Sequence, residues 1–241
     1  MTTIPADPPE GPAPTFRVGF RAGYQAMFPL WLAVVPFGVA MAILAHSAGL
    51  GILQTQAMSV IVFAGAAQLT MIDLIGDGAS ILAIVLTVLL LNLRHLLYGL
   101  SLDRHLPPRP HPPRAILAYF LTDETYGVTI AAYRNGAGSV AYYVGSGASL
   151  WTIWQLSTLA GGLIGERIPD PSRYGLEMVF PLTFLSILLP LIRRRTDLVV
   201  VAIAAVTALV AVRIVDGGTT VFLATIIAAG IGAAITRGEE P

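Results

Sequence analysis

The sequence predicts an all-α membrane protein, a polytopic bundle of about seven to eight transmembrane helices, some of them broken by proline or glycine. Hydrophobic residues make up 55% of the chain and charged residues only 12%, too few to give a soluble domain of 241 residues its charged surface. The mean hydropathy is +0.75. Apolar stretches close to the ~20 residues that cross a bilayer follow one another along the chain.

The composition divides the chain into three parts. Residues 1–16 are rich in proline and carry two acids and no base, which predicts a disordered tail without the basic start of a signal peptide. Residues 17–237 form a single transmembrane domain, and residues 238–241 form a short polar tail.

Eight apolar segments are the candidate spans, and short polar breaks separate most of them. If all eight cross, the arginines other than Arg94 divide seven against six between the two faces. The Arg193–Arg195 triplet belongs to the side with seven arginines, which also holds Arg17 and Arg21, and this favours a cytoplasmic position for that side. A re-entrant segment anywhere would overturn this count. The segments are 22–45, 54–76, 80–102, 116–133, 140–165, 174–192, 197–214 and 219–236.

The first two segments contain residues that can interrupt a helix: Pro29 and Pro36-Phe37-Gly38 in the first, and Ala64-Gly65-Ala66-Ala67-Gln68 in the second. Broken helices tolerate membrane depth only when their free backbone groups face protein or water, and the N terminus of a half-helix attracts a carboxylate. A simple kink or a tight helix crossing would explain each motif equally well. Gln68 places a side-chain amide beside the possible break in the second motif, which favours a binding site over a simple kink there. The candidate binding or coupling residues here are Pro36, Gly38, Gly65 and Gln68.

The third segment carries a polar stripe made by Asn92, Arg94, His95 and Tyr98. At 100° per residue these side chains lie between about 200° and 360° on the helical wheel, and leucines fill the arc from about 40° to 140°. An ionisable group at membrane depth costs at least ~2.5–3.5 kcal/mol and is usually retained for function. All four residues are therefore candidates for substrate binding or coupling.

Asp123 and Glu124 lie in the middle of the fourth segment. A continuous helix would place Asp123 on one face with Tyr119 and Tyr126, and Glu124 among apolar side chains. One explanation is a structural ion pair with Arg94 or a helix end near the interface; the other is a proton or substrate site. The second is favoured because acid and base lie on different helices, each near the middle.

Two patterns concern the packing of the chain. Arg21-x-Gly23-x4-Phe28-Pro29-Leu30 recurs as Arg173-x-Gly175-x4-Phe180-Pro181-Leu182, which indicates either an inverted repeat, as in many secondary transporters, or a chance match. Small residues at four-residue spacing predict a close helix contact within the protein. They are Gly145, Ser149, Ser157, Gly161 and Gly165.

The chain contains none of the motifs HExxH, GxSxG or GxxxxGK[ST], so the sequence predicts neither an enzyme nor a cofactor. A net charge of zero gives no case for a nucleic-acid partner. The chain has no cysteine, which excludes disulfides and thiolate metal sites.

Four motifs occur in the same order as in one family: Pro36-Phe37-Gly38, Phe63-Ala64-Gly65-Ala66-Ala67-Gln68, the run from Asn92 to Leu102, and Thr122-Asp123-Glu124. The chain resembles the AzlC family, the large subunit of branched-chain amino acid exporters, from about Phe20 to Ile235. The resemblance implies a multi-pass protein of the bacterial inner membrane, a small four-helix AzlD-type partner subunit, and export of valine, leucine, isoleucine or related neutral amino acids.

These observations predict a secondary transporter that exports neutral aliphatic amino acids by alternating access, driven by proton exchange. Either Arg94 or a half-helix N terminus would hold the substrate carboxylate. Asp123 would meet the amino group or carry the coupling proton, with His95 as an alternative proton carrier. A small-solute channel and a non-transporting membrane scaffold are the alternatives.

Overall fold

The computed structural model describes residues 15–106, 114–167, 194–215 and 217–236, together with isolated positions from 175 to 192. Within these residues the chain is helical and contains no strand. The proline-rich tail up to residue 14, the C-terminal tail and most of the candidate span 174–192 lie outside the described residues. So do Arg173 and Pro181, which leaves the predicted repeat at offset 152 without a described second copy.

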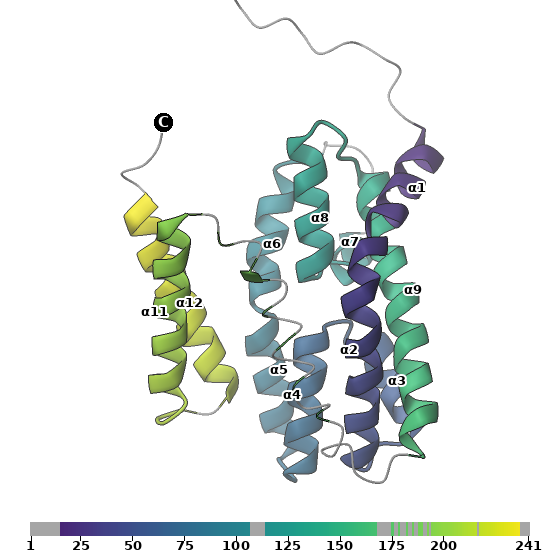
Figure 1. Ribbon diagram of the computed structural model, residues 1–241, viewed down its shortest axis with the longest axis vertical. Coiled ribbons are helices and arrows are strands. Elements are labelled where there is room, and N and C mark those ends of the chain that lie inside the picture. Colours follow the sequence, from purple (N-terminus) through teal and green to yellow (C-terminus); the bar gives the residue numbers. More distant parts are fainter. Residues whose placement is uncertain are drawn as a thin grey trace, which may run out of the picture.

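Three stretches run the full height of the molecule (Figure 1). Helix α1 (Phe16–Ala26) continues through Met27 into α2 (Phe28–Ser47), α5 (Ile81–Asn92) continues through Leu93 into α6 (Arg94–Asp103), and α9 (Val140–Gly165) is unbroken. At 1.5 Å per residue, the 26 residues of α9 extend about 39 Å, more than the ~30 Å hydrocarbon core of a bilayer. Among the described helices, α2 and the stretch Ile81–Asp103 are both long and apolar enough to cross a membrane, whereas α9 has the length but not the same hydropathy.

Helix α9 packs against α1 and α2 along its small residues. A Cβ on Gly145 would overlap the Phe20 carbonyl, and one on Gly161 would overlap the Val39 carbonyl, so the backbones meet where side chains are absent. Ser149 and Ser157 are buried in the same interface. The prediction that this ridge packs within the protein is confirmed.

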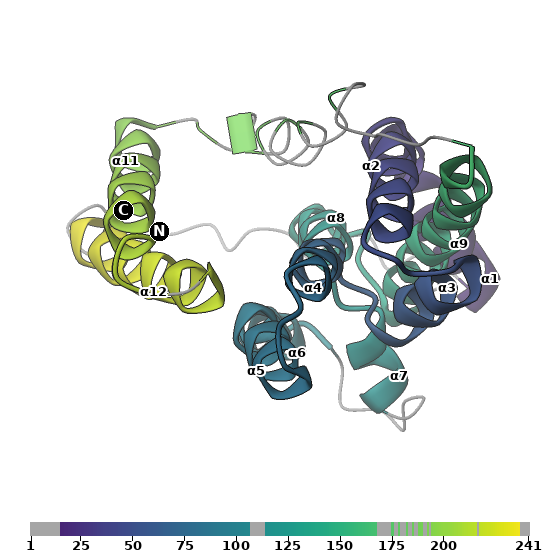
Figure 2. The same cartoon turned by 90° about the horizontal axis from the view of Figure 1, so that it is seen from below.

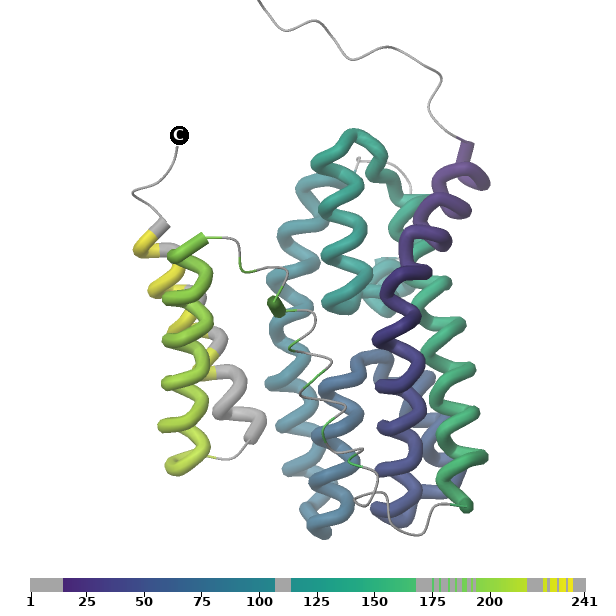
Figure 3. Tube along the Cα trace, viewed as in Figure 1, coloured from purple at the N-terminus to yellow at the C-terminus, as the bar shows by residue number. Residues whose placement is uncertain are grey.

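Two predicted spans are not single continuous helices. Helices α3 (Ile52–Ile61) and α4 (Gly65–Gly76) form a hairpin in the lower half of the molecule, and α7 (Arg114–Tyr119) and α8 (Asp123–Arg134) form one in the upper half (Figures 1 and 3). Helices of 10 to 12 residues reach only about 15–18 Å, half of a bilayer core. We call these the lower and upper re-entrant hairpins, because each turns back near mid-height. The predicted count of seven to eight spans is therefore not supported.

Local sequence explains both turns. Helix α3 ends at Ile61 and the lower hairpin turns at residues 62–64. The β-branched residues Val60, Ile61 and Val62 lie at this point and disfavour further helix. The upper hairpin turns at residues 120–122, where Thr122 caps α8 by accepting a hydrogen bond from the Thr125 N–H. A threonine followed by two acids is a typical helix start, and this signal could have identified the turn from the sequence.

The expected break at Pro36 does not form, because α2 is continuous through this residue. Gly38 lies directly against Ser157 of α9, which is the tight helix crossing that the sequence also allowed for this motif. Pro29 lies in the first turn of α2, where a missing backbone N–H costs nothing. The break near Pro29 therefore precedes the proline, at Met27.

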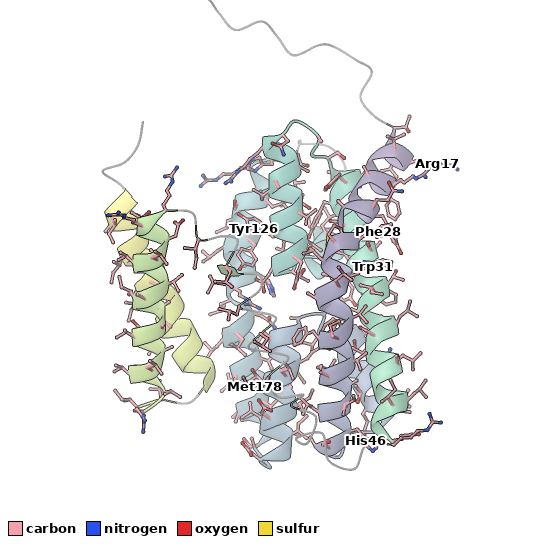
Figure 4. All side chains as sticks on the ribbon, viewed as in Figure 1. Arg17, Phe28, Trp31, His46, Tyr126 and Met178 are labelled. Carbon is pink, nitrogen blue, oxygen red and sulfur yellow. The ribbon has the colours of Figure 1, made fainter. Side chains whose placement is uncertain are left out.

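The last described helices, α11 (Arg195–Ala211) and α12 (Gly217–Thr236), form a separate pair, and α12 packs on α5 (Figure 2). Because both re-entrant hairpins turn back, the arginines at the helix ends are distributed between the two ends of the molecule differently from the eight-span prediction. Among the described arginines, those at helix ends on the side where α1 begins are Arg17, Arg21, Arg104, Arg134, Arg194 and Arg195, and those on the other side are Arg167 and Arg213 (Figure 1). Figure 4 labels Arg17 at the start of α1. The even division expected for eight spans is replaced by a clear asymmetry.

Candidate functional site

The two re-entrant hairpins meet at mid-height. Helix α4 runs down from this level and α8 runs up from it (Figure 1), and the view from below places α4 under α8 (Figure 2). The N termini of these two half-helices therefore face each other. Between them lies the central cavity, closed at its sides by α2, α9 and the bend between α5 and α6. Its polar or charged lining residues are Arg94, His95, Thr122, Asp123 and Glu124.

An ion pair crosses this cavity. Arg94 Nη2 lies 3.0 Å from Asp123 Oδ2, and the side chains are 25% and 27% exposed. The pair is thus accessible from the cavity and not sealed in the core. Arg94 stands where the helix tightens, since the Leu93 N–H bonds to the Leu90 carbonyl and the Leu96 N–H bonds to the Leu93 carbonyl. The structural ion pair considered from the sequence exists, and it lies inside the candidate site.

The two facing helix starts differ in their caps. At α8, the Thr122 and Thr125 side chains each accept a hydrogen bond from the other residue's backbone N–H, and Thr125 Oγ1 also donates to the Phe120 carbonyl at 2.7 Å. At α4, the residue before the helix is Ala64 and no side chain caps it. The first N–H groups of α4 therefore lack a side-chain acceptor, and they give this end of the cavity a partial positive charge.

The ends of α3 and α7, which also lie at this level, do have partners. Tyr119 Oη donates to the Val60 carbonyl at 2.6 Å and accepts from Trp151 Nε1 at 2.8 Å. Tyr143 Oη donates to the Leu117 carbonyl at 2.6 Å. Tyr119 thus satisfies a carbonyl in the last turn of α3, which would otherwise be costly at membrane depth, and Tyr143 adds a second donor to a carbonyl that also accepts from the Phe120 N–H. Tyr119 also joins the two hairpins directly.

Several buried polar atoms around the site have no partner among the described residues. Gln68 is fully buried, and neither its Nε2 nor its Oε1 makes a hydrogen bond. Trp154 Nε1 and Arg94 Nε are likewise unpaired within the described part of the chain. Buried polar groups are normally satisfied, so such a cluster beside a cavity indicates a place where a ligand or water supplies the missing bonds.

Residues that sequence reasoning missed shape the apolar wall. Phe37 and Trp154 line the cavity with ring centroids 5.3 Å apart, and both side chains are buried. A Cβ on Gly65 would lie 2.6 Å from Phe37 Cε1 and 3.0 Å from Trp154 Cη2, so glycine lets α4 begin against these rings. Nothing in the local pattern around Trp154 distinguishes it from an ordinary core residue.

The structure brings half of the predicted site residues to the central cavity: Gly65, Arg94, His95, Asp123 and Glu124. Gln68 is buried one helical turn below Gly65. Tyr98 stacks on Tyr126 of α8, with ring centroids 4.6 Å apart. Asn92 lines a neighbouring cavity, whereas Pro36 and Gly38 do not line either one.

The predicted faces of the fourth segment need one correction. Tyr126 lies on α8 with Asp123, but Tyr119 belongs to α7, beyond the turn at 120–122. Glu124 lines the cavity and is not placed among apolar side chains only. The error arose from assuming a continuous helix, since a turn resets the angular relation between residues on either side of it.

The central cavity is small. A volume of about 40 Å³ is open to the centres of water-sized molecules, and about 10–15 Å³ of this measure holds one water. The space suits a compact, charged group of a few atoms. The surroundings offer a carboxylate, a guanidinium and an uncapped helix start, which are complementary to a zwitterion.

The family model described as AzlC protein matches residues 29–168. The Escherichia coli "Inner membrane protein YgaZ" is 29% identical over 202 residues, covering 80% of this chain and 82% of that protein. A membrane protein of Archaeoglobus fulgidus is 31% identical over 180 residues, covering 73% and 77%. One from Helicobacter pylori strain J99 is 26% identical over 184 residues, covering 76% and 79%. No solved structure matches the chain.

The matched region begins at the first turn of α2 and ends just after α9, so it includes both re-entrant hairpins, the Arg94–Asp123 pair and the central cavity. The alignments with the relatives named as membrane proteins cover most of this chain and most of each relative. The protein is therefore a membrane protein that belongs to the AzlC family.

Proposed function

We propose that the protein is a secondary transporter that exports neutral aliphatic amino acids across the bacterial inner membrane. It works by alternating access, is driven by proton exchange, and acts as a multi-pass protein with a small AzlD-type partner subunit. The observation that carries this proposal is the meeting of two oppositely oriented half-helices at a cavity that contains the Arg94–Asp123 pair. Discontinuous helices that meet near the midplane are typical of substrate sites in secondary transporters.

The charges around the cavity support a zwitterionic substrate in a defined orientation. The substrate carboxylate lies between Arg94 and the uncapped start of α4, where both the guanidinium and the free N–H groups attract an anion. The substrate ammonium lies next to Asp123, on the side of the capped α8. Because Asp123 already neutralises Arg94 at 3.0 Å, a bound amino acid replaces one internal ion pair with two external ones.

The regrouped arginines support an orientation for the protein. Cytoplasmic loops of membrane proteins carry an excess of lysine and arginine. The end where α1 begins carries most of the described arginines, and the opposite end carries Asp73, Asp77 and Glu166 near its helix ends. The start of α1 and the turn between α8 and α9 therefore face the cytoplasm.

A flux assay in proteoliposomes tests the proposal. Vesicles that contain the protein, with and without its partner subunit, are loaded in turn with each labelled neutral amino acid, with and without a pH gradient. We expect saturable efflux of aliphatic amino acids that responds to the gradient. Flux that does not saturate would identify a channel, and the absence of flux for all of these amino acids with the partner present would favour a scaffold.

The variant Arg94→Lys links the assay to the site. Lysine keeps the charge but cannot make the two parallel hydrogen bonds of a guanidinium with a carboxylate. A hydrogen bond to a charged group contributes about 1.5–3 kcal/mol, so efflux should fall by roughly tenfold or more. Efflux at the wild-type rate and abundance would remove Arg94 from the substrate site.

A further inference from the structure

The central cavity can hold the charged part of an amino acid but has no room for an aliphatic side chain as well. Its volume of about 40 Å³ corresponds to about three water molecules. Two of its walls are closed by buried side chains, since Phe37 and Trp154 pack on each other and Leu150 of α9 is 3% exposed. If a substrate's head group lies beside Arg94 and Asp123, its side chain must leave in another direction.

A second cavity lies in that direction. It has a volume of about 250 Å³ and shares three lining residues with the central cavity: Phe63, Ala64 and His95. We call it the side cavity. The tips of both re-entrant hairpins and helix α5 form its walls, and most of its other lining residues are apolar, among them Ile61, Val88 and Leu121. The side cavity is open at the surface of the protein, where Ile61 is 76% exposed.

We propose that the side cavity is the side-chain subsite of the transporter. The head group of the substrate stays at Arg94 and Asp123, and its aliphatic side chain passes between Phe63 and His95 to contact Ile61, Val88 and Leu121. This inference rests on the proposed function. It assigns selectivity for branched aliphatic side chains to α5 and the hairpin tips, away from the charged groups.

The chemistry of the subsite agrees with this assignment. Binding sites for small molecules are mostly apolar, with a few polar groups that fix orientation. The side cavity contains Asn92, whose buried Oδ1 makes no hydrogen bond among the described residues. An aliphatic side chain gains free energy on entering such a space, at about 0.8 kcal/mol per buried CH₂. A hydrogen or a single methyl group would gain little, so glycine and alanine should be exported measurably but more slowly than leucine.

The test fills the subsite without touching the charged groups. In vesicles loaded with either labelled leucine or labelled alanine, Val88→Trp should reduce leucine efflux by about tenfold or more and leave alanine efflux within about twofold of wild type. The matched control is Leu89→Trp, because Leu89 is the next residue on α5, is 59% exposed and does not line the side cavity. This control should leave both fluxes unchanged.

A second variant keeps the test decisive if Val88→Trp does not reach the membrane. Val88→Ala enlarges the side cavity and should raise efflux of phenylalanine relative to valine. The subsite is wrong if Val88→Trp lowers leucine and alanine efflux equally or lowers neither, or if Val88→Ala leaves the preference unchanged. If the wild-type protein exports no amino acid, the proposed function itself fails, and this outcome is distinct from the others.

Discussion

The two re-entrant hairpins have similar backbones that enter from opposite ends of the molecule, but the residues at their tips differ in charge and in helix capping. Each ends one half-helix near mid-height and begins another there, so α4 and α8 face each other across the central cavity. The upper hairpin caps α8 with Thr122 and adds Asp123 and Glu124, whereas the lower hairpin begins α4 with Ala64 and Gly65 and has no side-chain cap. One end of the cavity is therefore acidic and the other carries only a helix start.

This difference shows how a pair of similar backbones can bind a dipolar ligand in one orientation. Two identical tips would present the same charge from both sides and would favour an ion of one sign. Because one tip is acidic and the other exposes backbone N–H groups, the proposed zwitterionic substrate would place its ammonium group at the first tip and its carboxylate at the second.

The largest expected effect concerns the direction of the hairpins. The chain has no cysteine, so single cysteines can be introduced at Val18, Asp77 and Asn135 and tested with a membrane-impermeant thiol reagent. The structure predicts that Val18 and Asn135 label from one side and Asp77 from the other. Labelling of Asp77 from the same side as Val18 would restore the eight-span arrangement and contradict the re-entrant lower hairpin.

Making the lower tip resemble the upper one should block transport without harming the fold. The variant Ala66→Asp places a carboxylate in the first turn of α4, where an acid stabilises a helix by about 0.3–1 kcal/mol. The same charge repels a substrate carboxylate, and we expect efflux to fall by about tenfold or more. Ala66→Ser is the neutral control. For Ala66→Asp, the midpoint of thermal unfolding in detergent should therefore rise while the efflux rate falls. If both fall together, the substrate carboxylate does not bind at the start of α4.

Neutralising the upper tip should affect its two acids unequally. Asp123→Asn removes the partner of Arg94 and the proposed contact with the substrate ammonium, whereas Glu124→Gln removes a carboxylate with no ion pair at or below 4.0 Å among the described residues. We expect the larger loss of efflux for Asp123→Asn, measured at equal membrane abundance. A larger loss for Glu124→Gln would exchange the roles of the two acids. Loss of Asp123→Asn from the membrane would instead support a purely structural pair.

The smallest effect is expected where the two tips touch. Tyr119→Phe removes the hydrogen bond to the Val60 carbonyl and leaves Trp151 Nε1 without its acceptor. The bond to Val60 is exposed and Trp151 is only partly buried, so the loss should be that of ordinary hydrogen bonds, about 1 kcal/mol each, and the unfolding midpoint should fall by a few degrees while substrate affinity is preserved. Tyr126→Phe removes a similar bond, to Ser101 Oγ, away from the tips, and serves as the comparison.

The sequence predicted the helical class and the residues of the site better than the path of the chain. Insertion cost alone identified Arg94 and Asp123, because charged residues in apolar segments are conspicuous. The break that the sequence allows at Ala64-Gly65 does form, since α3 ends at Ile61 and α4 begins at Gly65. What was missed is that the chain turns back there and again at 120–122, because segments 54–76 and 116–133 have the length and hydropathy of true spans. The Thr122 cap and the β-branched run at Val60 are further local signals of these two turns. Phe37 and Trp154 could not be assigned to the site, since an aromatic residue that lines a cavity has the same local pattern as one in the core.

The hydrogen bond between Tyr119 and the Val60 carbonyl has a consequence for leakage through the membrane. It ties the inner end of a hairpin rooted on one face of the bilayer to the inner end of a hairpin rooted on the other. In an alternating-access cycle, neither hairpin can withdraw far from the centre without either breaking this bond or pulling the opposite hairpin along. The intact bond therefore disfavours a state in which both hairpins retreat at once. In the proposed proton-driven cycle, such a state would be open to both sides of the membrane and would dissipate the gradient.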